Sequence, residues 1–186
     1  MDKVKIPLSK TKLLLGISGS ILFVVLGVFL FMTIADYQTR FSPTFVKGAG
    51  IAGILFFSAT GIYGIRKMFD NITGLTIDEN GIVDNTNASS VGLIKWSDIT
   101  GIETAEVAST KFLLIRTRNP EYYLGKVKGF KKKLMEGNNK MYGTPLSITS
   151  NTLKYKFKDL EKLIYDRFQE QQKQMPNVLI KQNKNG

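Results

Sequence analysis

The stretch LLLGISGSILFVVLGVFLFMTIA, residues 13–35, decides the architecture of this protein, because it runs for 23 residues without a charge. As a helix rising 1.5 Å per residue it is about 34 Å long, enough to cross a hydrocarbon core of roughly 30 Å with some tilt. A second uncharged stretch, GAGIAGILFFSATGIYGI, covers residues 48–65 and is about 27 Å long as a helix, which is just sufficient. We therefore predict two transmembrane helices, at 13–35 and 48–65, which the short linker 36–47 holds antiparallel and adjacent.

Two other interpretations of these stretches are weaker. A cleavable signal peptide has a basic start, an apolar region of 7–15 residues and a small residue at the cleavage site, for which Ala35 would serve. The first apolar run is far longer than that, and a second follows after only 12 residues. A helical hairpin buried in a soluble core would need other segments to cover both helices on all sides, which a chain of 186 residues cannot easily supply.

Small residues recur in both apolar stretches. Helices in membranes approach closely where Gly, Ala or Ser leaves room for the neighbouring backbone. Because glycine is common in transmembrane helices, the pattern predicts packing within the hairpin rather than dimerisation. Neither stretch contains a charge, which disfavours a transporter or proton path built by this chain alone. The residues expected to pack the hairpin are Gly16, Ser20, Ala49, Gly53 and Gly61, with Gly27 and Gly64 near the same faces.

The flanking charges predict an orientation. Residues 1–12 form a basic arm with four lysines, and Arg66 and Lys67 follow the second stretch, whereas the linker carries only Arg40 and Lys47. Loops rich in Lys and Arg stay in the cytoplasm. We therefore expect a two-pass protein with both termini cytoplasmic and the linker 36–47 outside.

The chain contains neither Cys nor His. Their absence excludes disulfides, thiolate metal sites and cysteine nucleophiles, and it removes the commonest general base and metal ligand. No P-loop, dinucleotide-binding glycine pattern or nucleophile elbow is present. We expect a protein that is not an enzyme and that has no cofactor and no metal; catalysis would have to rely on carboxylates, Lys, Tyr, Ser or Thr.

The net charge is +11, and the part from Arg66 onward has 20 Lys and Arg against 13 Asp and Glu, a balance of +7. A basic domain tethered to a bilayer is attracted to anionic headgroups by about 1 kcal/mol for each Lys or Arg near the surface. Nucleic acid is the rival explanation for basicity, and a cytoplasm-facing domain can also be basic without a partner. We expect a lipid partner, or an unknown protein, and no nucleic acid.

After the second stretch the pattern changes to short β-type runs, and we assign residues 66–172 to one cytoplasmic domain. Leu75–Ile77 and Ile82–Val83 flank an acidic turn, Asp78–Gly81. A three-residue loop ending on Gly81 is preferred there, with Ile77 opposite Val83. Phe112–Ile115 is apolar on both faces and should be the central strand, and Trp96 should pack in the core with one polar edge. Other strands are expected at 91–96, 101–107, 111–117 and 145–149.

Two helices are expected in the domain. Asn119, Pro120 and Glu121 form a start signal, and Tyr123, Val127, Phe130 and Leu134 follow at helical spacing. Such a basic amphipathic helix either lies on an anionic membrane surface or packs its apolar stripe on the sheet with the lysines in water. The last helix is expected from Lys158 to Gln172, followed by a flexible tail, residues 173–186. The candidate membrane contacts are Lys126, Lys128, Lys131, Lys132 and Lys133.

A hairpin anchor, short antiparallel strands and a closing amphipathic helix resemble those of bacterial PH-like membrane proteins, the YcxB-like proteins and related two-span families. The resemblance rests on GLTIDENGIVDN (Gly74–Asn85), GLIKWSDITGIE (Gly92–Glu103), KFLLIRTRNPEYY (Lys111–Tyr123) and YGTPLSITSNTL (Tyr142–Leu153). It implies a membrane α-hairpin plus an α+β domain: a bent antiparallel sheet or partial barrel with a C-terminal capping helix and an inserted basic amphipathic helix. It also implies the bacterial inner membrane. The acidic turn Asp78–Gly81 departs from phosphoinositide-binding PH domains, which place basic residues in and beside that loop.

Two functions follow from these features. The first is a non-catalytic, membrane-tethered module that presents its PH-like domain to a protein or to the inner leaflet. The second is a small accessory or regulatory subunit that docks into a membrane complex through its hairpin. The basic helix favours the first, and the small residues of the apolar stretches favour the second.

Overall fold

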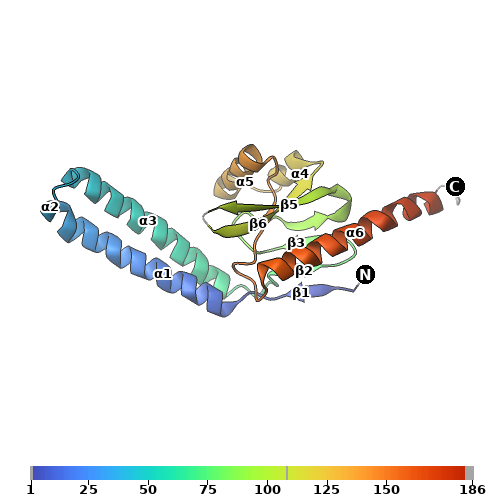
Figure 1. The fold of residues 1–186 in the computed structure, drawn as a ribbon, viewed down its shortest axis with the longest axis horizontal. Coiled ribbons are helices and arrows are strands. Elements are labelled where there is room, and N and C mark those ends of the chain that lie inside the picture. The colour runs from blue at the N-terminus through green and yellow to red at the C-terminus, as the bar shows by residue number, and fades with distance from the viewer. Residues whose placement is uncertain (1, 108, 183–186) are drawn as a thin grey trace. The chain divides into compact units, whose positions relative to one another are not determined.

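A computed structural model describes residues 2–107 and 109–182, with side chains described as far as Gln174 (Figure 1). The chain forms two compact units. One is the helical hairpin, Ser9–Asn71, and the other is a domain that combines the residues up to Leu8 with those from Ile72 onward. We describe each unit by itself.

The hairpin consists of two long helical arms. The first is α1 (Lys10–Phe29), which continues through a π-helical turn, η1 (Leu30–Ile34), into α2 (Ala35–Tyr37). The second is α3 (Pro43–Met68). With 28 and 26 residues, both arms are long and apolar enough to cross a membrane. Only 17% of the most apolar window of each arm is buried, whereas the core helix of a soluble protein would be mostly covered.

The connection between the arms is shorter than the predicted linker 36–47. It spans residues 38–42, because the helical arms extend to Tyr37 on one side and begin again at Pro43 on the other. Ser42 caps α3, its Oγ accepting the Phe45 N–H at 3.3 Å, and Pro43 occupies the first helical turn. Serine before proline is a strong helix start. Across the turn, Lys47 Nζ lies 2.8 Å from Asp36 Oδ1.

The helices meet along a seam that differs from the predicted one. Ser20 Oγ and Thr60 Oγ1 are 3.2 Å apart, and a Cβ built on Gly61 would lie 3.3 Å from the Ser20 Cβ. Gly27, Gly50 and Gly64 are also in close contact with the opposite helix. Ser20, Gly27, Gly61 and Gly64 therefore lie where they were expected.

Three of the predicted packing residues lie off the seam. Cβ atoms built on Gly16 and Gly53 would meet nothing within 4 Å, and Ala49 is exposed, with its neighbour Gly50 buried instead. Each helical residue is rotated by about 100° from the one before it, so a face assigned one residue early points away from the partner. Gly50 faces Gly27 and Phe31, a contact that the spacing of small residues did not predict.

The described residues of the domain form two antiparallel sheets and three helices. The first sheet has the order β1 (Val4–Ile6), β2 (Leu75–Ile77), β3 (Gly81–Asp84) and β4 (Gly92–Lys95). A short 3-10 turn, η2 (Trp96–Asp98), leads to the second sheet, β5 (Ile99–Val107), β6 (Thr110–Thr117) and β7 (Ser147–Ile148). The helices are α4 (Pro120–Gly125), α5 (Gly129–Tyr142) and α6 (Phe157–Gln182). The chain is thus an α-hairpin joined to an α+β domain.

The N-terminal residues are not a free basic arm. Val4, Lys5 and Ile6 pair with Ile77, Thr76 and Leu75 as the edge strand of the first sheet. The Lys154 N–H donates to the Pro7 carbonyl at 2.9 Å, and Leu8 forms a bridge with Leu153. The assignment of residues 1–12 to a separate arm was wrong for residues 4–8, because three apolar residues among lysines gave too short a strand signal.

The β2–β3 turn is tighter than predicted. Ile77 pairs with Ile82, not with Val83, and the Asp78 N–H donates to the Gly81 carbonyl at 3.1 Å around a two-residue turn. Gly81 has φ +155°, and a Cβ there would lie 2.1 Å from the Ile94 carbonyl oxygen. A glycine is needed at this position because β4 passes too close for any side chain.

One core joins both sheets and α6. Leu113 and Ile115 of the central strand β6 are fully buried, and so are Leu160 and Ile164 of α6. Trp96 lies in the same core with its indole N–H donating to the Asp78 carbonyl at 2.8 Å, which is the packing expected from the sequence. The last helix continues past the predicted end at Gln172 to Gln182; residues 183–186 of the predicted tail lie outside the described residues.

The inserted segment is two helices rather than one. The break at residues 126–128 falls between Gly125 and Gly129, and Gly129 has φ +60°. Two glycines four residues apart make a continuous helix costly, by about 1 kcal/mol each. Beyond the break, the Phe130 side chain points outward and is 74% exposed. Met135 is the residue of α5 that is buried instead. Phe130 therefore does not belong to the apolar stripe that the spacing predicted.

Candidate functional site

Two features of the domain stand out as candidate sites: a basic surface on α4 and α5, and a cavity beneath α5. The basic surface contains all five predicted lysines. Lys126 and Lys128 lie in the α4–α5 connection, and Lys132 and Lys133 are exposed in the first turns of α5. Lys131 is half-buried, on the side of the helix that also carries the buried Met135. Four of the five thus face water, and Lys131 is the exception.

Exposed aromatic and apolar side chains accompany these lysines. Tyr122 is 48% exposed, and the Lys126 ammonium lies 4.2 Å from the centre of its ring. Phe130 and Met141 are exposed on α5. Aromatic rings beside lysines are typical of segments that lie at the boundary between headgroups and acyl chains. We call this set, Tyr122, Lys126, Lys128, Phe130, Lys132 and Lys133, the basic–aromatic surface.

The charge balance of the segment is strongly positive. Between Pro120 and Gly143 there are six lysines and two acids, a net charge of +4. One of the acids, Glu136, lies 3.8 Å from Lys132 in an exposed ion pair one turn along α5. The pair offsets the charge of one lysine, and the segment as a whole keeps its net charge of +4.

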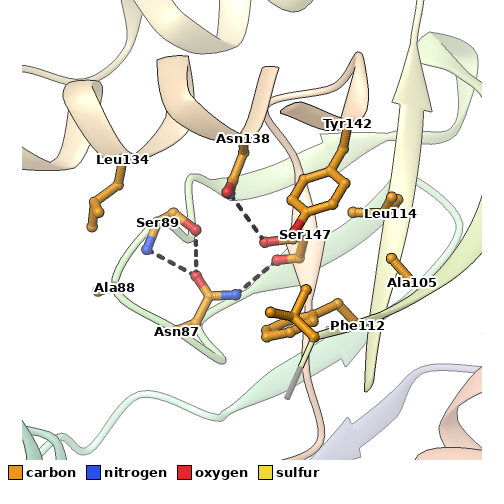
Figure 2. A pocket seen from close by; sticks show the side chains of 11 residues that line it. Asn87, Ala88, Ser89, Ala105, Phe112, Leu114, Leu134, Asn138, Tyr142 and Ser147 are labelled. Atoms are coloured by element: carbon orange, nitrogen blue, oxygen red, sulfur yellow. Dashed lines mark hydrogen bonds between the residues drawn. The ribbon is translucent and has the colours of Figure 1, made fainter. Parts of the chain in front are cut away.

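The cavity lies between α5, the β5–β6 hairpin and the loop after β3, and has a volume of about 290 Å³ (Figure 2). Its wall is mainly apolar: Ala105, Phe112, Leu114 and Leu134 line it. Ala105 and Phe112 are cross-strand partners, which places both on the face of the second sheet beneath α5. Small-molecule sites are usually pockets with mainly apolar walls and volumes from about 300 Å³ upward, and this cavity lies at the lower end of that range.

Polar groups gather at one end of the cavity. Asn87 is held firmly: its Oδ1 accepts the Ser89 N–H at 2.8 Å, and its Nδ2 donates to the Ser147 carbonyl at 2.8 Å. Asn138 of α5 makes only a long contact, with its Nδ2 3.5 Å from Ser147 Oγ, and the Tyr142 ring lies beside it (Figure 2). Among the described residues the Tyr142 hydroxyl has no hydrogen-bond partner.

An ion pair stands beside the cavity without lining it. Arg116 Nη2 lies 2.7 Å from Glu103 Oε2, and Arg116 Nε donates to Glu103 Oε1 at 3.0 Å. The hydrogen bond from Arg116 lowers the pKa of the Glu103 carboxyl, and the same bond raises the pKa of Arg116. Arg116 also donates to the Tyr142 carbonyl. Arg116 therefore links the end of α5 to the sheet. Its charge is neutralised by Glu103.

The lysines could be predicted from the sequence, and the cavity could not. The lysines are close together in the chain, whereas the described cavity residues come from five separate segments, around residues 87, 105, 112, 138 and 147. The hydrogen bond from Asn87 to the Ser147 carbonyl, 60 residues further along the chain, could not be predicted from the sequence. Within the described residues no group of three or more Asp or Glu side chains is placed to hold a metal ion. Comparison with protein-family models, curated proteins and solved structures finds no match for this chain.

Proposed function

We propose that this chain is a two-pass protein of the bacterial inner membrane that presents a non-catalytic, PH-like cytoplasmic domain to the anionic surface of the inner leaflet. The observation that carries the proposal is the basic–aromatic surface on a domain bound to an apolar hairpin. The surface offers lysines for headgroups and exposed rings for the interface beneath them.

The fold supports the PH-like part of the proposal. In the part of the chain that the structure describes, two antiparallel sheets of four and three strands share one core with the C-terminal helix α6. A partial barrel closed by a helix is built from these same elements. The β2–β3 turn corresponds to the loop that binds lipid in phosphoinositide-binding PH domains, but here the turn is acidic. Its Asp78 forms an ion pair with Lys3, with Oδ2 and Nζ 3.6 Å apart. The proposed contact is therefore on α4 and α5 rather than at that turn.

Two observations support cytoplasmic termini. Arg66 and Lys67 lie in the last turn of α3, and four lysines precede or begin α1. At the opposite end of the hairpin, Lys47 is paired with Asp36, which leaves that end with less positive charge. The pairing of β1 with β2 supports placing the N-terminal strand and the rest of the domain on the same side of the membrane.

The affinity expected of the basic–aromatic surface for an anionic bilayer suits a domain that is tethered to the membrane. Four exposed lysines contribute about 4 kcal/mol near an anionic bilayer, which corresponds to a dissociation constant of about 1 mM. A free domain would hardly bind at that affinity. A short linker gives an effective concentration in the millimolar range, so the same surface would be engaged much of the time when the hairpin is embedded.

The test uses the full chain in lipid nanodiscs, with a fluorophore on a single cysteine at Gly137. This position is exposed on α5, and a Cβ there meets nothing within 4 Å. We expect the emission of an environment-sensitive dye to shift to the blue in discs with anionic lipid, compared with discs of phosphatidylcholine alone. Reversing Lys126, Lys128, Lys132 and Lys133 to Glu should abolish the shift.

The matched control makes the same change of charge elsewhere. Lys154, Lys156, Lys158 and Lys162 are exposed outside the basic–aromatic surface, and their reversal to Glu should leave the shift intact. Equal emission in anionic and neutral discs would refute a lipid contact. The domain would then face a protein partner, which cross-linking at the same cysteine would capture.

A groove in the hairpin favours the second function, a subunit that docks through its helices. It has a volume of about 350 Å³ and is lined from both helices, by residues that include Ile17, Val24, Ser58 and Ile62. A helix of a partner protein would fill it. Replacing Ser58 with Leu should then remove a co-purifying subunit, while Gly53→Leu, on an open face, should retain it. Loss with both variants or with neither counts against this docking site.

A further inference from the structure

We propose that the cavity between α5 and the β5–β6 hairpin binds a small uncharged amphipathic molecule, with a hydrocarbon body and one hydroxyl or carbonyl group. This inference is independent of the membrane contact on the outer side of α5. It rests on the volume of the cavity, the separation of its apolar and polar lining, and the absence of charge from that lining.

The volume sets the size of the ligand. An apolar protein cavity of about 150 Å³ holds benzene, and this one is about 290 Å³. A bicyclic or short branched hydrocarbon therefore fits, and a lipid with two acyl chains does not. Ala105, Phe112 and Leu134 provide dispersion contacts from the strand side and from the helix side, which is how a flat ligand is held between a sheet and a helix.

The polar end provides the hydrogen bonds. The Tyr142 hydroxyl can donate or accept and has no partner among the described residues. The Nδ2 atom of Asn138 lies 3.5 Å from Ser147 Oγ. This distance is longer than that of a good hydrogen bond, so the Asn138 carboxamide can still bind a ligand. Asn87, by contrast, is fixed by bonds of 2.8 Å and keeps the loop in place. Tyr142 and Asn138 are therefore the groups that would recognise the polar end of the ligand.

The lining selects against a charged ligand. None of the described residues that line the cavity is charged, and the neighbouring Arg116 and Glu103 already bind each other with two hydrogen bonds, of 3.0 and 2.7 Å. A carboxylate or ammonium group bound against this lining would lose part of its hydration without gaining a counter-ion, which weakens its binding. An uncharged molecule has no such cost.

The experiment uses 2-naphthol as the probe and the full chain in phosphatidylcholine nanodiscs. The chain has no cysteine, so a single cysteine at Ala88, on the rim of the cavity, reports occupancy through its rate of reaction with N-ethylmaleimide. Free probe is set to the same concentration in every sample by equilibrium dialysis. At saturation we expect 2-naphthol to slow the reaction about fivefold or more. A cysteine at Ser97, which is exposed on η2 and does not line the cavity, should react at an unchanged rate.

Three comparisons make the result specific. The anion 2-naphthoate should bind about tenfold more weakly than 2-naphthol. Ala105→Trp, which fills the cavity, should remove the protection. Tyr142→Phe should bring the affinity for 2-naphthol close to that for naphthalene, while Trp96 fluorescence shows that the variant is folded. The proposal is overturned if 2-naphthol gives no protection at Ala88, if Ser97 is protected equally, or if the anion binds as well as the neutral probe.

Discussion

At the scale of single residues, the most informative group is Tyr123, the largest polar side chain that is fully buried. Its hydroxyl donates to Asp98 Oδ2 at 2.8 Å and accepts the Lys95 N–H at 3.3 Å. Burial raises the pKa of Tyr123 well above the ordinary value of 10.0, and the bond to Asp98 adds to the rise. The ionised phenolate would be buried next to a carboxylate.

This shift predicts a loss of stability at high pH. Below about pH 10 the phenol is protonated in both the folded and the unfolded state, and its contribution to stability is complete. Above about pH 10 the unfolded chain releases the proton while the folded chain keeps it, so the free energy of unfolding falls by about 1.4 kcal/mol per pH unit from this group.

The measurement is urea unfolding followed by the fluorescence of Trp96, which is the only tryptophan and lies in the core of the domain. Tyr123→Phe should cost roughly 1 kcal/mol at pH 8, and its stability should decline less steeply than that of the wild type from pH 10 to 11. Parallel curves for the two proteins over that range would contradict the assignment.

At the scale of elements, the short strand β1 is expected to stabilise a domain that begins almost seventy residues later in the chain. Ile6 is 2% exposed and belongs to the domain core. Ile6→Ala should lower the free energy of unfolding by about 2–4 kcal/mol, as reported by Trp96. Lys5→Ala, on the exposed face of the same strand, should change it by less than about 0.5 kcal/mol. An unchanged transition for Ile6→Ala would mean that β1 does not belong to the sheet.

The hairpin seam gives a second prediction at this scale. Cysteines at Ser20 and Gly61 should form a disulfide readily, because the Cβ atoms would be 3.3 Å apart, close to the spacing of about 3.5–4.5 Å in native disulfides. Gly50→Leu should slow its formation, since a Cβ at Gly50 already lies 3.0 Å from the Gly27 carbonyl oxygen. Gly53→Leu, with open space at its Cβ, should have no effect. Non-reducing electrophoresis measures the rate of disulfide formation in the double-cysteine protein and in its two Leu variants. Equal rates for the two Leu variants would contradict the packing of Gly50 against Gly27.

At the scale of the whole molecule, the pairing of β1 with β2 constrains how the chain is threaded. The two residues that enter and leave the hairpin are connected to neighbouring strands of one sheet. The sheet can therefore be completed only after α1 and α3 have been made, and the proposed two-pass topology requires β1 and β2 to be on one side of the membrane. Charge counting alone could not establish that link.

Single cysteines test the threading in intact cells. A membrane-impermeant thiol reagent should label a cysteine at Thr39, in the connection between the helical arms, and should leave cysteines at Asp2 and Ser109 unmodified. Labelling at only one of Asp2 and Ser109 would contradict the β1–β2 pairing. Labelling at both, with Thr39 protected, would keep the pairing and reverse the proposed orientation.

Much of the fold was readable from the sequence where the signal is local. The length and the uncharged composition of the run from Leu13 to Ala35 can be read directly from the sequence. The continuous apolar run Phe112–Ile115 likewise identifies the buried strand without reference to any other part of the chain. The same is true of the lysines from Lys126 to Lys133. The errors, by contrast, concern partners: Ala49 was chosen over Gly50, and Ile77 was paired with Val83, because a register or a facing side chain is a relation between two segments.

The hairpin that opens the chain was thus determined by the sequence itself, because crossing a bilayer depends on the length and composition of one continuous segment. The place of β1 in the domain, the seam through Gly27 and Gly50, and the cavity under α5 were decided only by the tertiary structure. Each of them brings together residues that are far apart in the chain, and the energy that selects such contacts comes from packing and hydrogen bonds that no single segment contains.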